Sequence, residues 1–260
     1  MRGRGNVVII GCGPAGLAAA EASIASGHRT FIASQNNEMS TQYGCQYLHA
    51  PIPGFESAPH TRVGYYLNGT PEQYRKKVYG AKWQGKVSPE DFVGEHEAWD
   101  IRETYEAMWH HLHSLANIEF VKIPVVKAGV LPAIIDRMQA VVVISTIPAM
   151  ALCHVQKHRF NYHMIYATGS VKREDTTTDD TIICDGTTDH EWYRNACVFG
   201  YRTIEWASKP NNGERIVAVP KPLVTDCDCY PGIHKIGRYG RWQKSYLVHQ
   251  AYPDVMEILK

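Results

Sequence analysis

A short apolar run, followed at once by closely spaced glycines, is the feature that most constrains this chain. Residues 6–10 are Asn-Val-Val-Ile-Ile, and so many β-branched side chains in a row predict a buried strand of a parallel sheet. The Gly-x-Gly-x-x-Gly segment 11–16 comes next, residues 17–25 predict a helix, and residues 30–33 predict a second strand. We therefore expect a strand–helix–strand unit with both strands inside the sheet.

Each glycine of this loop has a physical task in a dinucleotide site. Gly11 permits the tight turn, Gly13 lets the backbone approach a pyrophosphate, and Gly16 lets the helix pack closely on the strand. Pro14 and Ala15 begin the helix, whose free N–H groups and positive dipole end attract phosphates. Because the loop follows a strand and opens a helix, the motif predicts a dinucleotide-binding site.

The end of the second predicted strand lacks the acidic residue that usually binds the ribose hydroxyls of a dinucleotide. That position falls at Ser34 or Gln35, either of which can hydrogen-bond a ribose without charge. NADP sites also tolerate a missing acid. An NAD(P)-binding protein without flavin therefore stays open as an alternative to an FAD protein.

The loop in its full form, Gly-Cys-Gly-Pro-Ala-Gly-Leu at residues 11–17, resembles the opening of two-dinucleotide-binding flavoproteins. Three further segments resemble the branch that holds UDP-galactopyranose mutase and the amine-oxidase-like enzymes: residues 143–149, 192–194 and 237–242. The chain is also similar to small oxidoreductases of this type predicted in bacteriophages. The resemblance implies that FAD lies in a site built from both ends of the chain.

The loop chemistry and the resemblance together predict a set of cofactor contacts. Residues 43–51 are implied to run under the isoalloxazine ring, and the guanidinium of Arg238 matches the geometry of a pyrophosphate. The expected FAD contacts are Gly11, Gly13, Pro14, Ala15, Gly16, Ser34, Gln35, Gln46, Tyr47, Leu48, Val125, Thr146, Pro148, Gly237, Arg238 and Trp242.

No residue stands out as the catalyst, and three weak candidates are kept. His49 is a candidate general base, Arg194 a candidate contact for an anionic substrate group, and Trp242 a candidate neighbour of the flavin or substrate. Each has an ordinary structural alternative: a surface loop, an exposed sheet arginine and a packing aromatic.

The rest of the chain predicts the other layers of an α/β protein with a Rossmann-like FAD-binding parallel sheet. Capped helix starts at Thr70 and Ser88 and an apolar stripe over residues 99–115 predict a helical insertion. Short strand-like segments after Tyr162 predict a small antiparallel substrate-side sheet. The expected boundaries are 1–60, 117–155 and 232–260 for the FAD-binding domain, 61–116 for the helical insertion and 156–231 for the substrate lobe.

Composition and cysteine use narrow the class of partner. The 260 residues carry a net charge of +1, so bulk electrostatics favour neither nucleic acid nor a membrane surface as a partner. The apolar run at residues 7–10 is too short for a signal sequence, and the seven scattered cysteines favour a cytoplasmic protein. A small molecule is the expected substrate.

We expect no metal site from the sequence. The helix histidines His110, His111 and His113 have no cysteine or acidic ligand beside them at metal spacing, and Cys227-Asp-Cys229 is too tightly spaced for the usual zinc knuckle. These cysteines are interpreted as structural.

The sequence thus predicts an FAD-dependent oxidoreductase that transfers a hydride between the flavin and a small substrate. Besides the NAD(P) protein, two alternatives stay open. One is a flavin-dependent, mutase-like isomerase that holds a nucleotide sugar through Arg194. The other is a nucleotide-binding module without catalysis.

Overall fold

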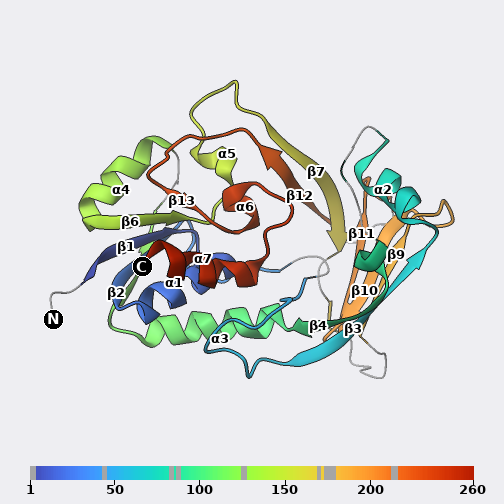
Figure 1. Cartoon of the computed structure of the whole chain (residues 1–260), viewed down its shortest axis with the longest axis horizontal. Helices are drawn as coiled ribbons and strands as arrows, with labels where there is room; N and C mark the ends of the chain where they lie inside the picture. The colour runs from blue at the N-terminus through green and yellow to red at the C-terminus, as the bar shows by residue number, and fades with distance from the viewer. Residues whose placement is uncertain are drawn as a thin grey trace.

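Two β-sheets, one parallel and one mixed, form the body of the molecule (Figure 1). The computed structural model describes residues 4–42, 46–81, 85, 89–123, 128–168, 171–172, 180–211 and 216–260. The strands of the first sheet are all parallel. In spatial order they are β13 (His234–Lys235), β6 (Ala140–Ser145), β1 (Arg4–Ile10), β2 (His28–Ser34) and β5 (Ile118–Lys122).

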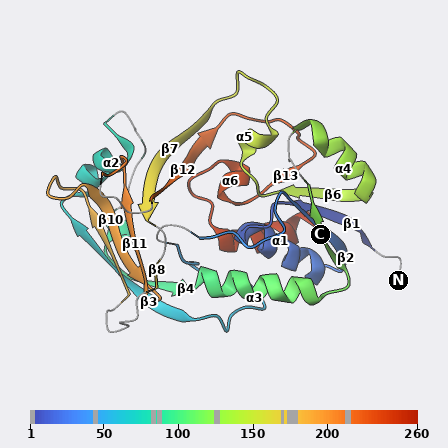
Figure 2. The same ribbon diagram turned by 180° about the vertical axis from the view of Figure 1, so that it is seen from behind.

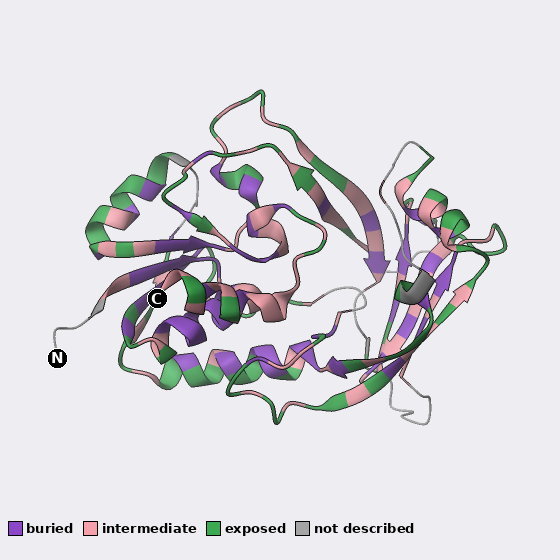
Figure 3. Cartoon of the chain, viewed as in Figure 1, coloured by how far each residue is buried: buried purple, intermediate pink, exposed green. Residues whose placement is uncertain are grey.

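Helices cover both faces of this sheet, and its central strands are accordingly apolar on both sides. Val7 and Ile9 of β1 pack into one hydrophobic core, whereas Val8 and Ile10 pack into another on the opposite face. Figure 3 shows residues 5–6 of β1 as partly buried and residues 7–10 as buried. The helices of the first face are α1 (Pro14–Ala25), α3 (Ile101–Ser114) and α7 (Ala251–Ile258), and those of the second are α4 (Leu131–Met138) and α5 (Ala149–Leu152).

The predicted strand–helix–strand unit is present as β1, α1 and β2. Both of its strands are internal, because β1 lies between β6 and β2 while β2 lies between β1 and β5. The α/β class with a Rossmann-like parallel sheet is thereby confirmed.

The second sheet is mixed and stands at the other end of the molecule (Figures 1 and 2). Its strands are antiparallel except for β3 and β9, which pair in parallel. Helix α2 (Pro71–Tyr79) packs Tyr74 and Val78 into its core. In spatial order the strands are β12 (Ile216–Thr225), β7 (Phe160–Thr168), β11 (Tyr201–Trp206), β10 (Trp192–Val198), β9 (Thr181–Asp185), β3 (His60–Asn68) and β4 (Gly94–Trp99), and β8 (Val171–Lys172) pairs with β11.

Residues 61–116, expected as a helical insertion, hold strands as well as helices. β3 pairs with β4 on one side and with β9 on the other, so this segment forms one edge of the second sheet. The pairing partner of β3 lies more than a hundred residues further along the chain, which places it beyond the reach of local sequence patterns. The insertion and the substrate lobe therefore share one layer.

The capped helix start at Thr70 is confirmed. Thr70 Oγ1 accepts a hydrogen bond from the Gln73 N–H at 3.2 Å, and Gln73 Oε1 accepts one from the Thr70 N–H at 2.7 Å. The second expected start is a single 3₁₀ turn, η1 (Pro89–Phe92), which leads directly into β4, and Ser88 lies outside the described residues.

The C-terminal segment returns to the first helix. After β13 come the short helix α6 (Gly237–Arg241), the 3₁₀ turn η3 (Val248–Gln250) and α7, which packs along α1 (Figure 1). A further 3₁₀ turn, η2 (Ala128–Val130), precedes α4. Over the described ranges, no helix combines the length and the apolar character needed to cross a bilayer.

Candidate functional site

A cavity of about 1060 Å³ lies between the two sheets. It begins where β1, β2 and β6 end, the place at which open parallel sheets bind their ligands. It extends to the second sheet, whose strands β7, β10, β11 and β12 contribute to its lining. One continuous space of the size of a large ligand pocket thus joins the two sheets.

The glycine loop forms the wall at the parallel-sheet end. Gly11 has φ +108°, a conformation that favours glycine, and its N–H donates to the Ala33 carbonyl at 2.9 Å. A Cβ on Gly16 would lie 2.0 Å from the Gly11 carbonyl oxygen, so only glycine lets α1 approach β1 this closely. A Cβ on Gly13 would meet no atom within 4 Å, because this residue borders the open cavity. The loop therefore has the steric features that a pyrophosphate cradle requires.

Neighbouring elements hold this loop in place. The Tyr105 hydroxyl, on α3, donates to the Cys12 carbonyl at 2.7 Å. After β6, the Thr146 N–H and hydroxyl donate to the Ile10 carbonyl at 2.9 and 3.1 Å. Gly13 caps α1 without a side-chain hydrogen bond, so the first turn presents backbone N–H groups toward the cavity.

The C-terminal turn closes the same wall from the other side. The Ile236 N–H donates to the Ser145 carbonyl at 3.0 Å, and a Cβ on Gly240 would lie 2.5 Å from that carbonyl oxygen. A Cβ on Gly237 would lie 3.1 Å from the Cβ of Ala15. Both ends of the chain thus meet at one wall of the cavity, as the sequence predicted.

The end of β2 lacks the acidic residue that usually binds ribose hydroxyls, but a carboxylate follows in the next loop. Ser34 is buried, and its hydroxyl donates to the Asn36 carbonyl at 2.9 Å and to Asn37 Oδ1 at 3.1 Å. Gln35 and Glu38 line the cavity on the loop that follows β2. Glu38 therefore supplies a carboxylate to this wall, a few residues later than the usual position.

A cluster of charged side chains forms the wall at the second sheet. Glu205 of β11 is buried, and its Oε2 accepts hydrogen bonds from the Tyr193 hydroxyl at 2.6 Å and the Lys221 ammonium at 2.9 Å. Arg194 Nη1 lies 3.5 Å from the same oxygen, and its Nη2 donates to the Tyr74 hydroxyl at 3.2 Å. Side chains of β10 and β12 thus converge on one carboxylate of β11, and α2 contacts this cluster through Arg194.

Local backbone geometry and charge explain this cluster. The register of β10 against β11 shifts between Trp192 and Arg194, and such a bulge re-aims the neighbouring side chains. Burial by itself would raise the pKa of Glu205, but the charges of Lys221 and Arg194 outweigh it and hold the pKa at about 2. Burial lowers the pKa of Lys221. Two cations surround one carboxylate, so this wall carries a positive charge.

Aromatic side chains line the space between the two walls. The hydroxyls of Tyr47 and Tyr65 lie 2.7 Å apart, and the ring centroids of Tyr47 and His49 lie 4.6 Å apart. The His49 residue is exposed to the cavity, and partial desolvation there, together with the imidazole of His249 and other neighbouring groups, lowers its pKa to about 4. His49 is therefore neutral at pH 7 and able to accept a proton or a hydrogen bond.

Most of the sequence-predicted site residues meet around this cavity. Leu48 and Trp242 instead lie in the packed interior, where the Trp242 Nε1–H donates to the Asn161 carbonyl at 2.9 Å. Val125 lies outside the described residues. The lining includes Gly11, Gly13, Pro14, Ala15, Gly16, Ser34, Gln35, Gln46, Tyr47, His49, Thr146, Pro148, Arg194, Gly237 and Arg238.

The sequence did not single out three residues of this site: Glu38 and Lys221, which line the cavity, and Tyr193, which contacts Glu205. Glu38 stands outside the window in which the ribose acid was sought, and a wider search of that loop would have found it. Lys221 alternates with prolines in β12, and Tyr193 was noted only within a short motif. Their meeting at Glu205 depends on strand register, for which the sequence holds no local signal.

Comparison with known proteins identifies structures with a similar fold but no sequence family for this chain. No protein-family model matches the chain, and no curated protein matches its sequence. Among solved structures, the peptidyl tryptophan dihydroxylase QhpG aligns with a TM-score of 0.57 and 10% identity over 97% of this chain. The chain spans 65% of the length of QhpG.

Two further structures share this fold. PqsL from Pseudomonas aeruginosa, described as a probable FAD-dependent monooxygenase, has a TM-score of 0.55 and 12% identity, and 98% of this chain aligns with 84% of it. HpxO from Klebsiella pneumoniae, solved with FAD and uric acid, has a TM-score of 0.55 and 10% identity, and the whole of this chain aligns with 80% of it.

The shared fold is that of FAD-dependent monooxygenases and hydroxylases. It supports the flavoprotein side of the resemblance seen in the sequence, but not specifically the branch of UDP-galactopyranose mutase and the amine oxidases. At these identities the likeness defines the architecture alone.

Proposed function

We propose that this chain is an FAD-dependent oxidoreductase that acts on a small substrate held against the second sheet. The observation that carries the proposal is the cavity itself, which joins a glycine loop and both chain ends to a buried cluster of charges. Similar folds support it, because HpxO was solved with FAD and uric acid bound. The bound FAD would supply the electron transfer, and the protein would supply binding, orientation and exclusion of water.

The residues present fit this cofactor. The open space beside Gly13 and the close packing at Gly16 leave the α1 N-terminus accessible to a pyrophosphate. Glu38 or Gln35 offers a hydrogen-bonding partner for ribose hydroxyls. Arg238 also lines the cavity, where its charge acts on Arg194 and Lys221 of the second-sheet cluster. We place the cofactor on the parallel sheet and the substrate on the second sheet.

The second-sheet wall favours a planar substrate with an anionic group. Tyr47, Tyr65 and Phe92 offer flat apolar surfaces, whereas Lys221 and Arg194 make the wall positive around Glu205. His49, held neutral, is placed to accept a proton from a substrate hydroxyl or amine. The nucleotide-sugar isomerase is less well supported, because the folds similar to this one are those of FAD-dependent monooxygenases and hydroxylases.

The colour and contents of the purified protein test the proposal. We expect a yellow protein that releases FAD on heating, identified by its mass, or an apoprotein that takes up added FAD at about one molecule per chain. A colourless protein that binds NADPH but not FAD would support the NAD(P) alternative and overturn the proposal. Bound flavin that dithionite cannot reduce would support a binding module without catalysis.

The substrate side has its own test. Adding urate or benzoate to the flavin-loaded protein should perturb the visible flavin spectrum, and Lys221→Met should weaken that response because one cation is lost. An equal response in both proteins would remove Lys221 from the substrate site while leaving the FAD assignment intact.

A further inference from the structure

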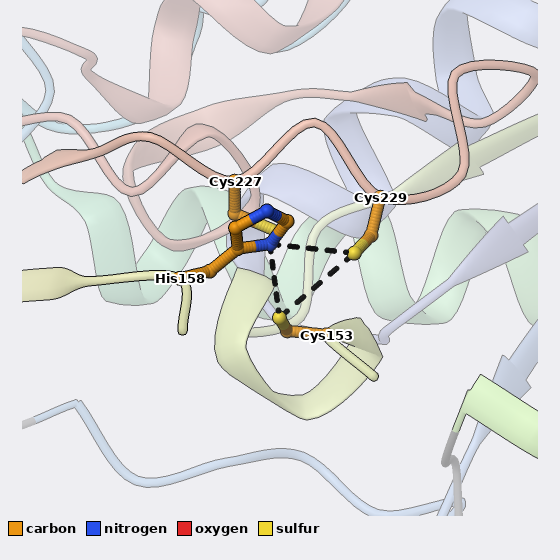
Figure 4. A group of neighbouring side chains, drawn as sticks. All are labelled: Cys153, His158, Cys227 and Cys229. Atoms are coloured by element: carbon orange, nitrogen blue, oxygen red, sulfur yellow. Dashed lines mark hydrogen bonds between the residues drawn. The ribbon is translucent and has the colours of Figure 1, made fainter. Parts of the chain in front are cut away.

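Away from the cavity, four side chains that are able to bind a metal converge on one point (Figure 4). Cys153 follows α5, His158 precedes β7, and Cys227 and Cys229 lie between β12 and β13. Each offers one ligand atom, and the four atoms all lie within 4.8 Å of one another. Segments far apart in the sequence thus bring three thiols and one imidazole together.

The distances among these atoms are those of a tetrahedral site. Cys153 Sγ and Cys229 Sγ lie 3.9 Å apart, and His158 Nδ1 lies 3.5 Å from each of them. Zinc bonds of about 2.3 Å to sulfur and about 2.0 Å to nitrogen place tetrahedral ligands about 3.8 Å (S to S) and about 3.5 Å (S to N) apart. Three of the ligand atoms therefore already stand at the separations that a bound ion would impose, and Cys227 Sγ lies within 4.8 Å of each of them.

The outer ring nitrogen of the histidine also has the partner expected in a metal site. His158 Nε2 lies 3.6 Å from Asp228 Oδ1, while Nδ1 faces the two sulfurs (Figure 4). Histidines that bind metals usually direct their second nitrogen to a carboxylate or carbonyl, which fixes the tautomer and the orientation of the ring. Cys229 is buried, the His158 side chain is 14% exposed, and Cys153 and Cys227 are partly buried.

We propose that Cys153, His158, Cys227 and Cys229 bind one Zn²⁺ ion in a closed, structural site. Three thiolates and one imidazole form a donor set that zinc prefers over magnesium or calcium. Four protein ligands fill a tetrahedral shell and leave no position for a substrate, so the ion stabilises the fold and takes no part in catalysis.

The location of the site indicates what the ion holds together. It joins residues 153–158, which follow Pro148 by a few positions, to residues 227–229, which precede Gly237. Pro148 and Gly237 both line the cavity. The ion also ties the start of β7 to the end of β12, the strand pair at one edge of the second sheet (Figures 1 and 2). Cys227 and Cys229 alone carry no metal signal in the sequence, because the other two ligands lie some seventy residues away.

Metal analysis of the full chain, purified without chelators under reducing conditions, tests this site independently of any flavin. We expect about one Zn²⁺ per chain in the wild type. Cys153→Ser and Cys229→Ser should lose it. Cys197→Ser should retain it, because Cys197 is a partly buried cysteine on β10 of the second sheet. Replacing zinc by Co²⁺ should produce a thiolate-to-cobalt charge-transfer band in the wild type and not in the Cys153 or Cys229 variants.

Asp228→Asn provides a second test in a variant that should fold normally, because the Asp228 side chain is 92% exposed. Its zinc affinity, measured by competition with a chelator, should fall by about 10- to 100-fold. A wild-type protein that neither carries zinc nor gives a cobalt band after metal is added would overturn the proposal. So would an intact mass showing a disulfide between Cys153 and Cys229 in place of the metal.

Discussion

At one end of the cavity the lining is mostly backbone and small residues, and at the other it is charged side chains. The glycine-loop wall presents N–H groups of α1 beside Gly13, where a Cβ would enter open space. The second-sheet wall presents Lys221 and Arg194 around Glu205. A backbone wall suits the pyrophosphate that all dinucleotides share, whereas a wall of placed charges suits one particular ligand. The two ends should therefore respond differently to substitution.

The largest effect on stability is expected at the charged wall. Glu205→Gln removes the carboxylate and leaves Lys221 and Arg194 facing each other without a counter-charge. Breaking a buried ion pair costs about 3–5 kcal/mol of unfolding free energy, and we expect about 3 kcal/mol because both cations are about a quarter exposed. Urea denaturation at pH 7 measures the change.

An exposed pair in the same sheet supplies the control. Glu95→Gln on β4 removes the charge of a side chain that is 65% exposed and pairs with Arg62, so the unfolding free energy should fall by less than about 1 kcal/mol.

The pKa of Glu205 is about 2 in the folded protein and ordinarily 4.5. Its stabilisation is therefore present above pH 4.5 and is lost as the pH falls toward 2, so wild type and Glu205→Gln should converge there. Equal losses for the Glu205 and Glu95 variants would contradict the assigned role of the cluster.

The next largest effect on stability is steric and is expected at the glycine-loop wall. Gly16→Ala places a Cβ 2.0 Å from the Gly11 carbonyl oxygen, so α1 must shift away from β1. Such overpacking costs about 1–3 kcal/mol, and we expect the upper part of this range because the atom in the way belongs to the backbone. Thermal denaturation of the apoprotein measures it, and an unchanged Tm would show that the loop is looser than the structure indicates.

Gly13→Ala, the same substitution three residues earlier, should affect FAD binding much more than stability. Gly13→Ala meets no atom within 4 Å, so we expect a loss of less than about 1 kcal/mol in stability, from the altered helix cap. Its methyl group occupies the space through which a pyrophosphate approaches the backbone, so FAD affinity should fall by at least about tenfold, or 1.4 kcal/mol. Unchanged FAD affinity in a stable Gly13→Ala protein would place the cofactor elsewhere.

The contrast between the two walls also explains what the sequence could predict. Gly11, Gly13 and Gly16 lie within six consecutive residues, and their spacing follows from local steric requirements. The loop and the elements around it, β1, α1 and β2, could therefore be predicted from the sequence. Glu205, Lys221 and Tyr193 come from three strands, and a register shift by one residue would separate them. The same holds for β3, whose partner β9 is remote, and for the four ligands of the proposed zinc site. Local signals therefore predicted the glycine-loop wall, and only the folded chain shows the second-sheet wall.

The smallest expected effect concerns His49, which borders the space between the two walls. Its pKa is about 4 in the folded protein and ordinarily 6.5, so the unfolded chain binds a proton first as the pH falls. His49 therefore destabilises the folded state progressively between pH 6.5 and pH 4, and His49→Gln should gain stability relative to wild type over this window. We expect a gain in unfolding free energy of at most about 1 kcal/mol, because solvent screens the partly exposed ring.

Urea midpoints measured across this pH range test the prediction for His49, with His110→Gln on the exposed face of α3 as the control. A difference between wild type and His49→Gln that stays constant from pH 6.5 to pH 4 would mean that the cavity wall does not suppress the charge of His49, and would remove the neutral proton acceptor from the proposed substrate site.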